Sequence, residues 1–145
     1  MFVPVNRPLF DNNEVREVTK TLKSGWVSAE SPINKQFEKN FSKKINRKFS
    51  VAVSSGTAAL DIAVKSLDLK KDDEIIVPTF TIISTLTQIV RQGIKPILVD
   101  SDPITWNMKV DEIEKKITKK TKAIMVVHIY GLPTDLKKIF HLAKK

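Results

Sequence analysis

The stretch Phe49-Ser50-Val51-Ala52-Val53-Ser54-Ser55-Gly56-Thr57-Ala58-Ala59-Leu60 decides the fold, because it joins an apolar run to a segment with helical periodicity. We predict a strand over 50–53 and a helix over 57–67. The Ser-Ser-Gly-Thr turn between them leaves backbone N–H groups and hydroxyls around one small volume, which suits a phosphate group. Serine and threonine also cap helices without any ligand, so a simple N-cap is the alternative.

The pattern downstream alternates short apolar runs with amphipathic segments and predicts an α/β fold. Continuous apolar strands separated by helices are typical of a mostly parallel sheet flanked by helices on both faces. We expect one domain over 1–145, with a helical lead-in over 1–48 and βα repeats over 49–145. The further expected strands are 74–77, 94–99 and 123–127, and the further expected helices are 11–24, 33–45, 82–92, 110–117 and 134–144.

Composition excludes several classes of site. The chain has 145 residues, no cysteine and only two histidines, which rules out disulfides and cysteine nucleophiles and leaves little basis for a metal site. We therefore expect no metal. The N-terminal residues lack a basic region followed by a sustained apolar stretch, so we expect no membrane segment and a cytoplasmic protein.

The net charge of +9 raises the possibility of nucleic-acid binding. Lysine pairs at 115–116, 119–120 and 137–138, however, lie on the polar sides of predicted amphipathic helices, as solvated surfaces do. No aromatic residues alternate with these lysines to stack on bases. We expect no nucleic-acid partner.

A ligand in an open α/β sheet binds beyond the carboxyl ends of the strands. Three segments lie there in the predicted fold: 54–58, 78–82 and 128–131. In the third, His128 and Tyr130 could serve acid–base chemistry, but a histidine that ends a strand is more often a hydrogen-bonded structural residue. We favour the structural interpretation of His128.

Several ordered blocks of the sequence resemble the N-terminal part of the DegT/DnrJ/EryC1/StrS family of sugar aminotransferases, which use pyridoxal 5′-phosphate (PLP). Within that family the closest resemblance is to GDP-perosamine synthase-like members, through Thr105-Trp106-Asn107-Met108 and the residues that follow. The family blocks are Val3-Pro4-Val5 with Pro8, Ser24-Gly25-Trp26-Val27, Phe37-Glu38, Ser55-Gly56-Thr57-Ala58-Ala59-Leu60, Asp73-Glu74-Ile75-Ile76-Val77-Pro78-Thr79-Phe80-Thr81, Val99-Asp100, Ile117-Thr118, Thr121-Lys122-Ala123-Ile124 and Val127-His128-Ile129-Tyr130-Gly131.

This resemblance implies a cofactor site, with residues assigned by position. The cofactor phosphate would lie on Ser55, Gly56, Thr57 and Ala58, bound by the backbone of Gly56 and Thr57 and by the Thr57 hydroxyl. The pyridine ring would lie against the segment that contains Phe80 and Ile82. Relatives often have an aromatic residue where this chain has Ile82, so stacking there is lost unless a different local backbone lets Phe80 supply it.

The loop at Gly25 and Trp26 has two interpretations. It is either a helix stop with a buried indole or, by resemblance, a loop that approaches the sugar nucleotide. The chain also departs from the family at Ser31 and at Asp72, where relatives place glycine. Aspartate tolerates left-handed turns, so the departure at Asp72 is mild, whereas Ser31 could reshape the substrate loop.

The resemblance further implies an activity and partners. Relatives are dimers, and the intact protein would transfer an amino group from glutamate to a keto carbon of a nucleotide-diphosphate-linked 6-deoxy sugar, for polysaccharide biosynthesis. In the family, the Schiff-base lysine lies beyond the position of Lys145, so we expect the chain to be an inactive N-terminal fragment. The alternatives are a PLP-dependent sugar dehydratase of the same family and a non-catalytic remnant that serves as an interaction module.

Overall fold

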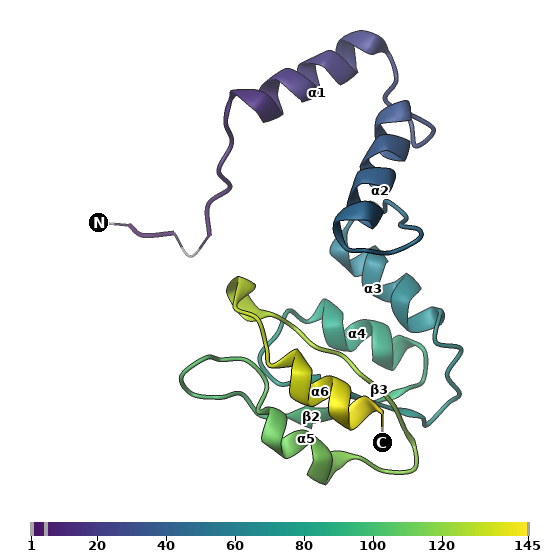
Figure 1. The fold of residues 1–145 in the computed structure, drawn as a ribbon, viewed down its shortest axis with the longest axis vertical. Helices are drawn as coiled ribbons and strands as arrows, with labels where there is room; N and C mark the ends of the chain where they lie inside the picture. Colours follow the sequence, from purple (N-terminus) through teal and green to yellow (C-terminus); the bar gives the residue numbers. More distant parts are fainter. Residues whose placement is uncertain (1, 5, 145) are drawn as a thin grey trace. The chain divides into compact units, whose positions relative to one another are not determined.

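A computed structural model describes residues 2–4 and 6–144 (Figure 1). These residues divide into two compact units, one up to residue 52 and one from residue 53 onward. Among the described residues, no helix is both long and apolar enough to span a membrane.

The first unit contains two helices, α1 (Asn12–Ser24) and α2 (Pro32–Lys44), and both sequence predictions are confirmed. Helix α1 begins at Asp11, whose carboxylate accepts a hydrogen bond from a backbone N–H of the first turn, and it ends at Gly25 in the left-handed conformation (φ 73°). Helix α2 begins at Ser31, whose hydroxyl caps the helix ahead of a proline at its first position.

The predicted strand over 50–53 is wrong. No strand lies beside these residues in the described part of the chain, and a β-strand needs a neighbour to satisfy its backbone groups. Glu38 of α2 takes that place: its side chain accepts a hydrogen bond from the Ala52 N–H (2.8 Å), and its backbone carbonyl accepts one from the Ser50 hydroxyl. The segment therefore has the alternating apolar pattern of a strand but makes no hydrogen bonds to a neighbouring strand among the described residues.

The second unit is a parallel sheet with helices on both faces, as the sequence predicts. The strand order is β2-β1-β3, and both pairings are parallel. Apart from β3, the predicted elements of this unit from the 57–67 helix onward agree with the structure to within two residues at each end. The elements are α3 (Gly56–Lys65), β1 (Glu74–Pro78), α4 (Ser84–Arg91), β2 (Lys95–Val99), α5 (Val110–Lys116), β3 (Thr121–Ile124), the 3₁₀ turn η1 (Ile129–Gly131) and α6 (Leu136–Ala143).

Strand β3 begins and ends earlier than the predicted 123–127. Its last hydrogen bond to β1 runs from the Met125 N–H to the Ile76 carbonyl (2.8 Å). Backbone N–H groups of β1 alternate between its two neighbours, and the next one on the β3 side would belong to Pro78, which has none. The ladder therefore stops there.

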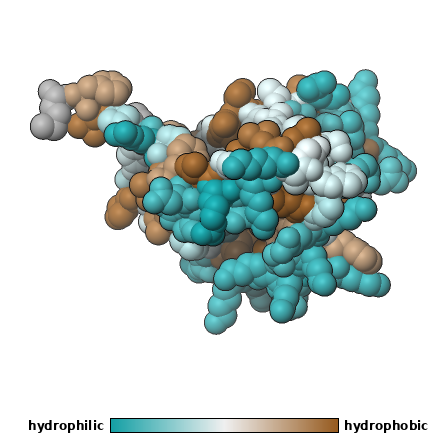
Figure 2. All heavy atoms as spheres, turned by 90° about the horizontal axis from the view of Figure 1, so that it is seen from above, coloured by the Kyte–Doolittle hydropathy of each residue, from teal (hydrophilic) through white to brown (hydrophobic). Residues whose placement is uncertain are grey.

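The core lies on both faces of β1, whose five residues are all buried. Side chains alternate along the strand, so Ile75 and Val77 face α3 and α4, whereas Ile76 faces α5 and α6. Large apolar side chains also remain exposed in both units, among them Val15, Val18 and Leu22 on one face of α1. Figure 2 shows such side chains, in brown, beside hydrophilic ones.

The turn that leads into β1 contains a residue in the left-handed conformation. Asp72 has a φ of 69°, which aspartate tolerates. Two residues later, the buried Glu74 accepts hydrogen bonds from the hydroxyls of Thr118 (2.6 Å) and Thr121 (3.3 Å). These bonds fasten the amino end of β1 to the segment that opens β3.

We predict that Ile76→Ala lowers the free energy of unfolding by about 2–5 kcal/mol, because it opens a cavity in the face that packs against α5 and α6. Leu98→Ala on the edge strand β2 is the control, since Leu98 is 45% exposed. Urea unfolding followed by circular dichroism measures both. Equal losses for the two variants would contradict the assignment of the core to β1.

Candidate functional site

The carboxyl ends of the strands and the N-terminus of α3 lie on the same side of the second unit. Helix α3 leads into β1 through residues 66–73, so its C-terminal end lies near the amino end of that strand. Its 10 residues span about 15 Å, the length of β1, which brings its first turn level with the carboxyl edge. Helices α3 and α4 pack together and run in the same direction (Figure 1).

The first turn of α3 contains both a cap and open donors. The Ser55 hydroxyl accepts a hydrogen bond from the Ala58 N–H (3.2 Å), as the capping alternative requires. In the described part of the chain, however, the N–H groups of Gly56 and Thr57 have no acceptor, as is usual for a first helical turn. A Cβ placed on Gly56 would meet no atom within 4 Å. The cap and an anion site are thus compatible at this turn.

The segment after β1 contains both expected ring contacts. Ile82 is 70% exposed, and Thr81 turns its hydroxyl to that of Thr85 in α4 (3.0 Å). Phe80, 39% exposed, contacts two aromatic residues from other loops. The contact of Phe80 and Ile82 with a pyridine ring stays a prediction.

Phe80, Trp106 and Tyr130 form an aromatic cluster at the carboxyl edge. The Phe80 and Trp106 rings meet edge to face with centroids 5.2 Å apart, and the Tyr130 ring lies 6.5 Å from that of Phe80. The three residues follow β1, β2 and β3 respectively. Sequence reasoning gave Trp106 no role at the site, because nothing in its spacing reveals a contact with residue 80.

Two residues of the aromatic cluster have left-handed backbones, with φ of 62° at Trp106 and 49° at Tyr130. Such conformations are rare for bulky residues and persist only where the surroundings hold them. The buried side chain of Asn107 joins the two loops: its Nδ2 donates to the Leu132 carbonyl (3.0 Å), and its Oδ1 accepts from the Ile129 N–H (3.1 Å). One amide group therefore fixes both segments.

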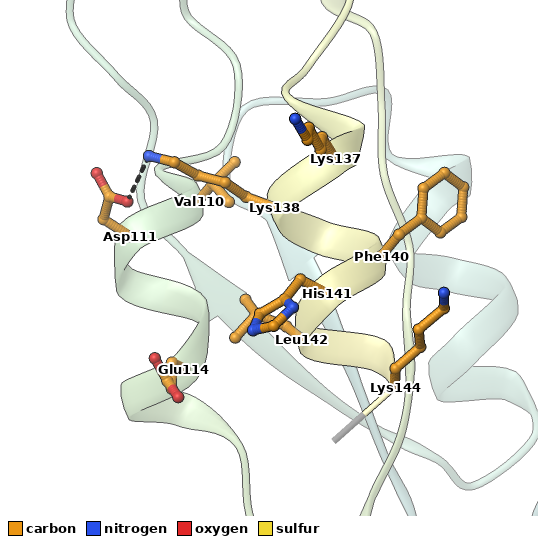
Figure 3. Close-up of a pocket in the computed structure, with 9 residues that line it drawn as sticks. All are labelled: Val110, Asp111, Glu114, Lys137, Lys138, Phe140, His141, Leu142 and Lys144. Atoms are coloured by element: carbon orange, nitrogen blue, oxygen red, sulfur yellow. Dashed lines mark hydrogen bonds and ion pairs between the residues drawn. The ribbon is translucent and has the colours of Figure 1, made fainter.

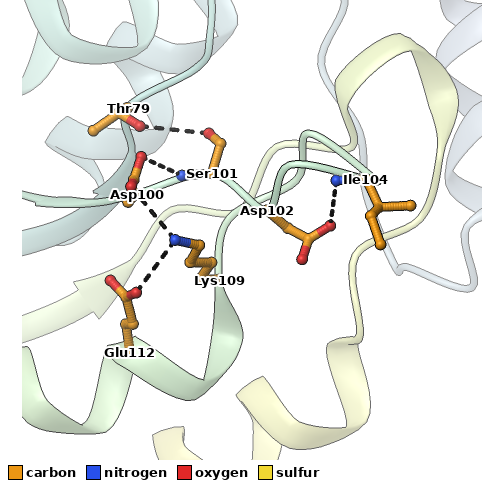
Figure 4. Close-up of polar contacts among 7 residues, drawn as sticks. All are labelled: Thr79, Asp100, Ser101, Asp102, Ile104, Lys109 and Glu112. Carbon is orange, nitrogen blue, oxygen red and sulfur yellow. Dashed lines mark hydrogen bonds and ion pairs between the residues drawn. The ribbon is translucent and has the colours of Figure 1, made fainter.

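Asp102 closes the loop that leads to Trp106 (Figure 4). Its Oδ1 accepts hydrogen bonds from the Thr105 N–H (2.8 Å), the Thr105 hydroxyl (3.0 Å) and the Ile104 N–H (3.0 Å). These donors, the Thr105 N–H above all, hold the pKa of Asp102 below its ordinary value. The sequence signal for this loop is the aspartate three residues before a threonine, typical of a side-chain-closed turn.

Asp100 lies at the end of β2 beside the same loop. Its Oδ1 accepts from the Ser101 N–H (2.8 Å), and its Oδ2 lies 3.5 Å from Lys109 Nζ, which also lies 3.6 Å from Glu112 (Figure 4). The Ser101 N–H and, second, the Lys109 charge lower the pKa of Asp100. The carboxylates of Asp100 and Asp102 are thus ionised near neutral pH.

His128 makes structural contacts. Its Nδ1 accepts a hydrogen bond from the Thr134 N–H (3.1 Å), and the Thr134 hydroxyl donates to the Val127 carbonyl (3.1 Å). Together these bonds close the turn between β3 and α6, which agrees with the structural interpretation of this histidine.

Comparison with known proteins identifies the family of the chain. The model of the DegT/DnrJ/EryC1/StrS aminotransferase family matches residues 8–145. The chain belongs to the DegT/DnrJ/EryC1/StrS aminotransferase family. A GDP-perosamine synthase from Escherichia coli O157:H7 is 43% identical over 143 residues, which are 99% of this chain and 39% of the relative. The chain thus spans little more than a third of the curated relatives that it matches.

Two solved structures of PLP-bound proteins contain the same fold. The Streptococcus pneumoniae protein Spr1654, named as a sugar aminotransferase and solved in its PLP form, gives a TM-score of 0.85 at 33% identity, over 97% of this chain and 36% of its own. A GDP-4-keto-6-deoxy-D-mannose-3-dehydratase from E. coli with bound hydrated PLP gives 0.87 at 29% identity, over 97% and 38%. The fold is therefore common to transferases and dehydratases.

The structure decides between parts of the two interpretations of the loop at Gly25 and Trp26. Gly25 ends α1, as a helix stop requires, but the indole of Trp26 is 54% exposed, so a buried indole is wrong. The approach of this loop to the sugar nucleotide stays a prediction. Ser31 is the buried N-cap of α2 with a negative φ, a conformation that does not require glycine.

A groove of about 670 Å³ lies between α5 and α6 (Figure 3). Lys138 spans it to Asp111 (3.1 Å), and its other lining groups include Lys137, His141 and Phe140. Within the described residues, no group of three or more histidines, cysteines or carboxylates is placed to hold a metal ion.

We predict that Asn107→Leu lowers the free energy of unfolding by about 1–3 kcal/mol, because it leaves the Leu132 carbonyl and the Ile129 N–H without partners. Asn40→Leu on the exposed surface of α2 is the matched control. Urea unfolding measures both variants. An Asn107→Leu variant as stable as the control would show that the amide does not join the loops.

We predict that the loop closed by Asp102 opens only at acid pH. A carboxyl with a lowered folded pKa stabilises the fold above its unfolded pKa, and this contribution is lost as pH falls below the ordinary value of 3.8. The Trp26→Phe variant leaves Trp106 as the single tryptophan, so its fluorescence reports the loop. Asp102→Asn cannot titrate and should weaken this transition. A transition above pH 3.8 that Asp102→Asn leaves unchanged would contradict the prediction.

Proposed function

We propose that this chain is the N-terminal part of the PLP-binding domain of a sugar aminotransferase. The intact protein would move an amino group from glutamate to a keto carbon of a nucleotide-linked 6-deoxy sugar. The observation that carries the proposal is the pair of unpartnered N–H groups at Gly56 and Thr57, which open the helix beside the carboxyl edge of a parallel sheet. Membership of the family supports the same reading.

The first turn of α3 suits the cofactor phosphate. A phosphate dianion is favoured at a helix N-terminus, where amide donors and the helix dipole both face it. The exposed hydroxyl of Thr57 adds a donor, and the open space at Gly56 lets an anion approach the backbone closely. Ser55 and Ala58 keep the turn in shape through their cap hydrogen bond.

The bound cofactor supplies an electron sink for chemistry at the substrate carbon. The chain's own residues would bind and orient it. Ile82, exposed after β1, offers an apolar contact to the pyridine ring, and Phe80 is proposed to line the same space from the aromatic cluster. The exposed Trp26 of the first unit is proposed to contact the sugar nucleotide.

We also propose that this chain alone does not catalyse transfer. No lysine occurs in the segment around the cap of α3 or in the segments that follow the three strands. These segments are 54–58, 79–83, 101–106 and 128–131. Lys109, the next lysine along, lies beside Asp100 and Glu112. The exposed apolar face of α1 supports the further proposal that the protein assembles as a homodimer.

The second candidate function is sugar dehydration, favoured by the TM-score of 0.87 to a dehydratase. Products distinguish the two reactions: a transferase consumes glutamate and forms an amino sugar in equal amounts, whereas a dehydratase removes a hydroxyl from the sugar.

We predict that pyridoxamine 5′-phosphate, which cannot form an imine with lysine, binds the purified protein saturably and that Thr57→Val weakens binding about tenfold, because one hydrogen bond to a charged group is lost. Fluorescence of the pyridine ring measures the affinity. Ser66→Ala removes a hydroxyl at the other end of α3 and is the matched control, expected to bind like the wild type.

Inorganic phosphate should compete with this ligand, because the two would share the donors of the first turn. Binding that Thr57→Val and Ser66→Ala leave equally strong, or a folded protein that binds no pyridoxamine 5′-phosphate, would contradict the proposed phosphate site.

A further inference from the structure

A shallow hollow of about 420 Å³ lies against the aromatic cluster, between β1 and the loop after β2. One side is aromatic, formed by Phe80 and Trp106. The other side is polar, formed by Thr79, Ser101 and the carboxylates of Asp100 and Asp102. The hollow thus combines flat apolar surface with hydrogen-bond acceptors.

The aromatic side is held in place although it is only partly buried. Trp106 is 51% exposed and Phe80 is 39% exposed, although both are large apolar side chains. The left-handed backbone at Trp106 and the buried amide of Asn107 fix the indole next to Phe80. Part of the apolar surface of both rings is thus open to a ligand.

The polar side selects the charge of what can bind. Asp102 uses Oδ1 for its loop, and its Oδ2 has no hydrogen-bond partner in the part of the chain that the structure describes. Asp100 shares Lys109 with Glu112. Thr79 and Ser101 face each other with hydroxyl oxygens 3.4 Å apart (Figure 4). Carboxylates repel a phosphate or another carboxylate and accept hydrogen bonds from hydroxyl groups.

A neutral sugar ring meets both requirements. Its C–H bonds carry slight positive charge and are attracted to the negative face of an aromatic ring, while its hydroxyl groups can donate to carboxylates. The carboxylates would repel the anionic ends of a cofactor or nucleotide. The backbone amides at the first turn of α3 offer those ends a better site.

We propose that this hollow is a subsite for a neutral sugar ring, with Phe80 and Trp106 as the stacking surface and Asp102 as the hydroxyl acceptor. The inference rests on the proposed function, because it assigns the sugar part of that substrate to named residues. In this proposal, charge separates the sugar from the phosphate groups. The sugar hydroxyls would lie at the loop after β2, and the phosphate would lie at the first turn of α3.

The test uses the Trp26→Phe variant, in which Trp106 is the single tryptophan. The probe is a neutral methyl 6-deoxyhexoside, and the comparison is the methyl hexuronide in which a carboxylate replaces the C6 methyl group. We expect the neutral sugar to change Trp106 fluorescence saturably and to bind about tenfold or more tightly than the uronide, since like charges repel at the polar side.

Two further variants sharpen the test. Asp102→Asn keeps an oxygen that can close the loop but removes the charge, so the preference over the uronide should shrink. Trp106→Leu removes the aromatic ring at this position, and isothermal titration calorimetry of this variant should then show no saturable binding of the neutral sugar, whereas the Trp26→Phe variant should show it. Glycerol at equal concentration controls for a general effect of polyols.

A neutral sugar that gives no saturable change at Trp106, or one that binds no better than the uronide, would overturn the subsite. Saturable binding of the neutral sugar that persists in Trp106→Leu would place the sugar elsewhere and also overturn it. Pyridoxamine 5′-phosphate binding is measured on the same samples. If that binding survives while the sugar response fails, the subsite alone is wrong; if it also fails, the proposed function is wrong.

Discussion

The parallel pairing of β1 on both of its edges is the constraint on which the second unit depends. Ile75, Ile76 and Val77 are fully buried, and they divide between two cores, one under α3 and α4 and one under α5 and α6. Parallel pairing also brings the carboxyl ends of all the strands to one edge. The candidate site exists because the loops that leave this edge, and the first turn of α3, share it.

Polar side chains then give those loops a defined shape. Asn107 joins the loops after β2 and β3, and Asp102 closes the first of them through three donors. These hydrogen bonds hold together aromatic rings that come from distant parts of the sequence. The two parts of the edge therefore suit different ligand groups. The backbone amides at the first turn of α3 suit anions, whereas the carboxylates and aromatic rings of the loop after β2 suit neutral groups that carry hydroxyls.

The sequence predicts what depends on local patterns. Apolar periodicity placed the helices, and Gly25 marked the end of α1. Prediction from the sequence fails where a residue distant in the sequence determines the local structure. The 50–53 segment alternates like a strand, but Glu38 and not a neighbouring strand binds it. The role of Pro78 in ending β3 depends on register, and the meeting of Trp106 with Phe80 depends on tertiary structure. The Ser-Ser-Gly-Thr motif suggested a phosphate site, which stays a prediction, whereas no motif indicated the aromatic cluster.

The central claim is that the first turn of α3 binds the phosphate of a pyridoxal-type cofactor, and chemical-shift mapping tests it most directly. Backbone amide spectra of the ¹⁵N-labelled protein are recorded during titration with pyridoxamine 5′-phosphate. We predict that the Gly56 and Thr57 amides shift most and reach saturation together with the ring fluorescence. Shifts that spread over the lysine-bearing surfaces of α5 and α6 and leave Gly56 and Thr57 unchanged would contradict the claim.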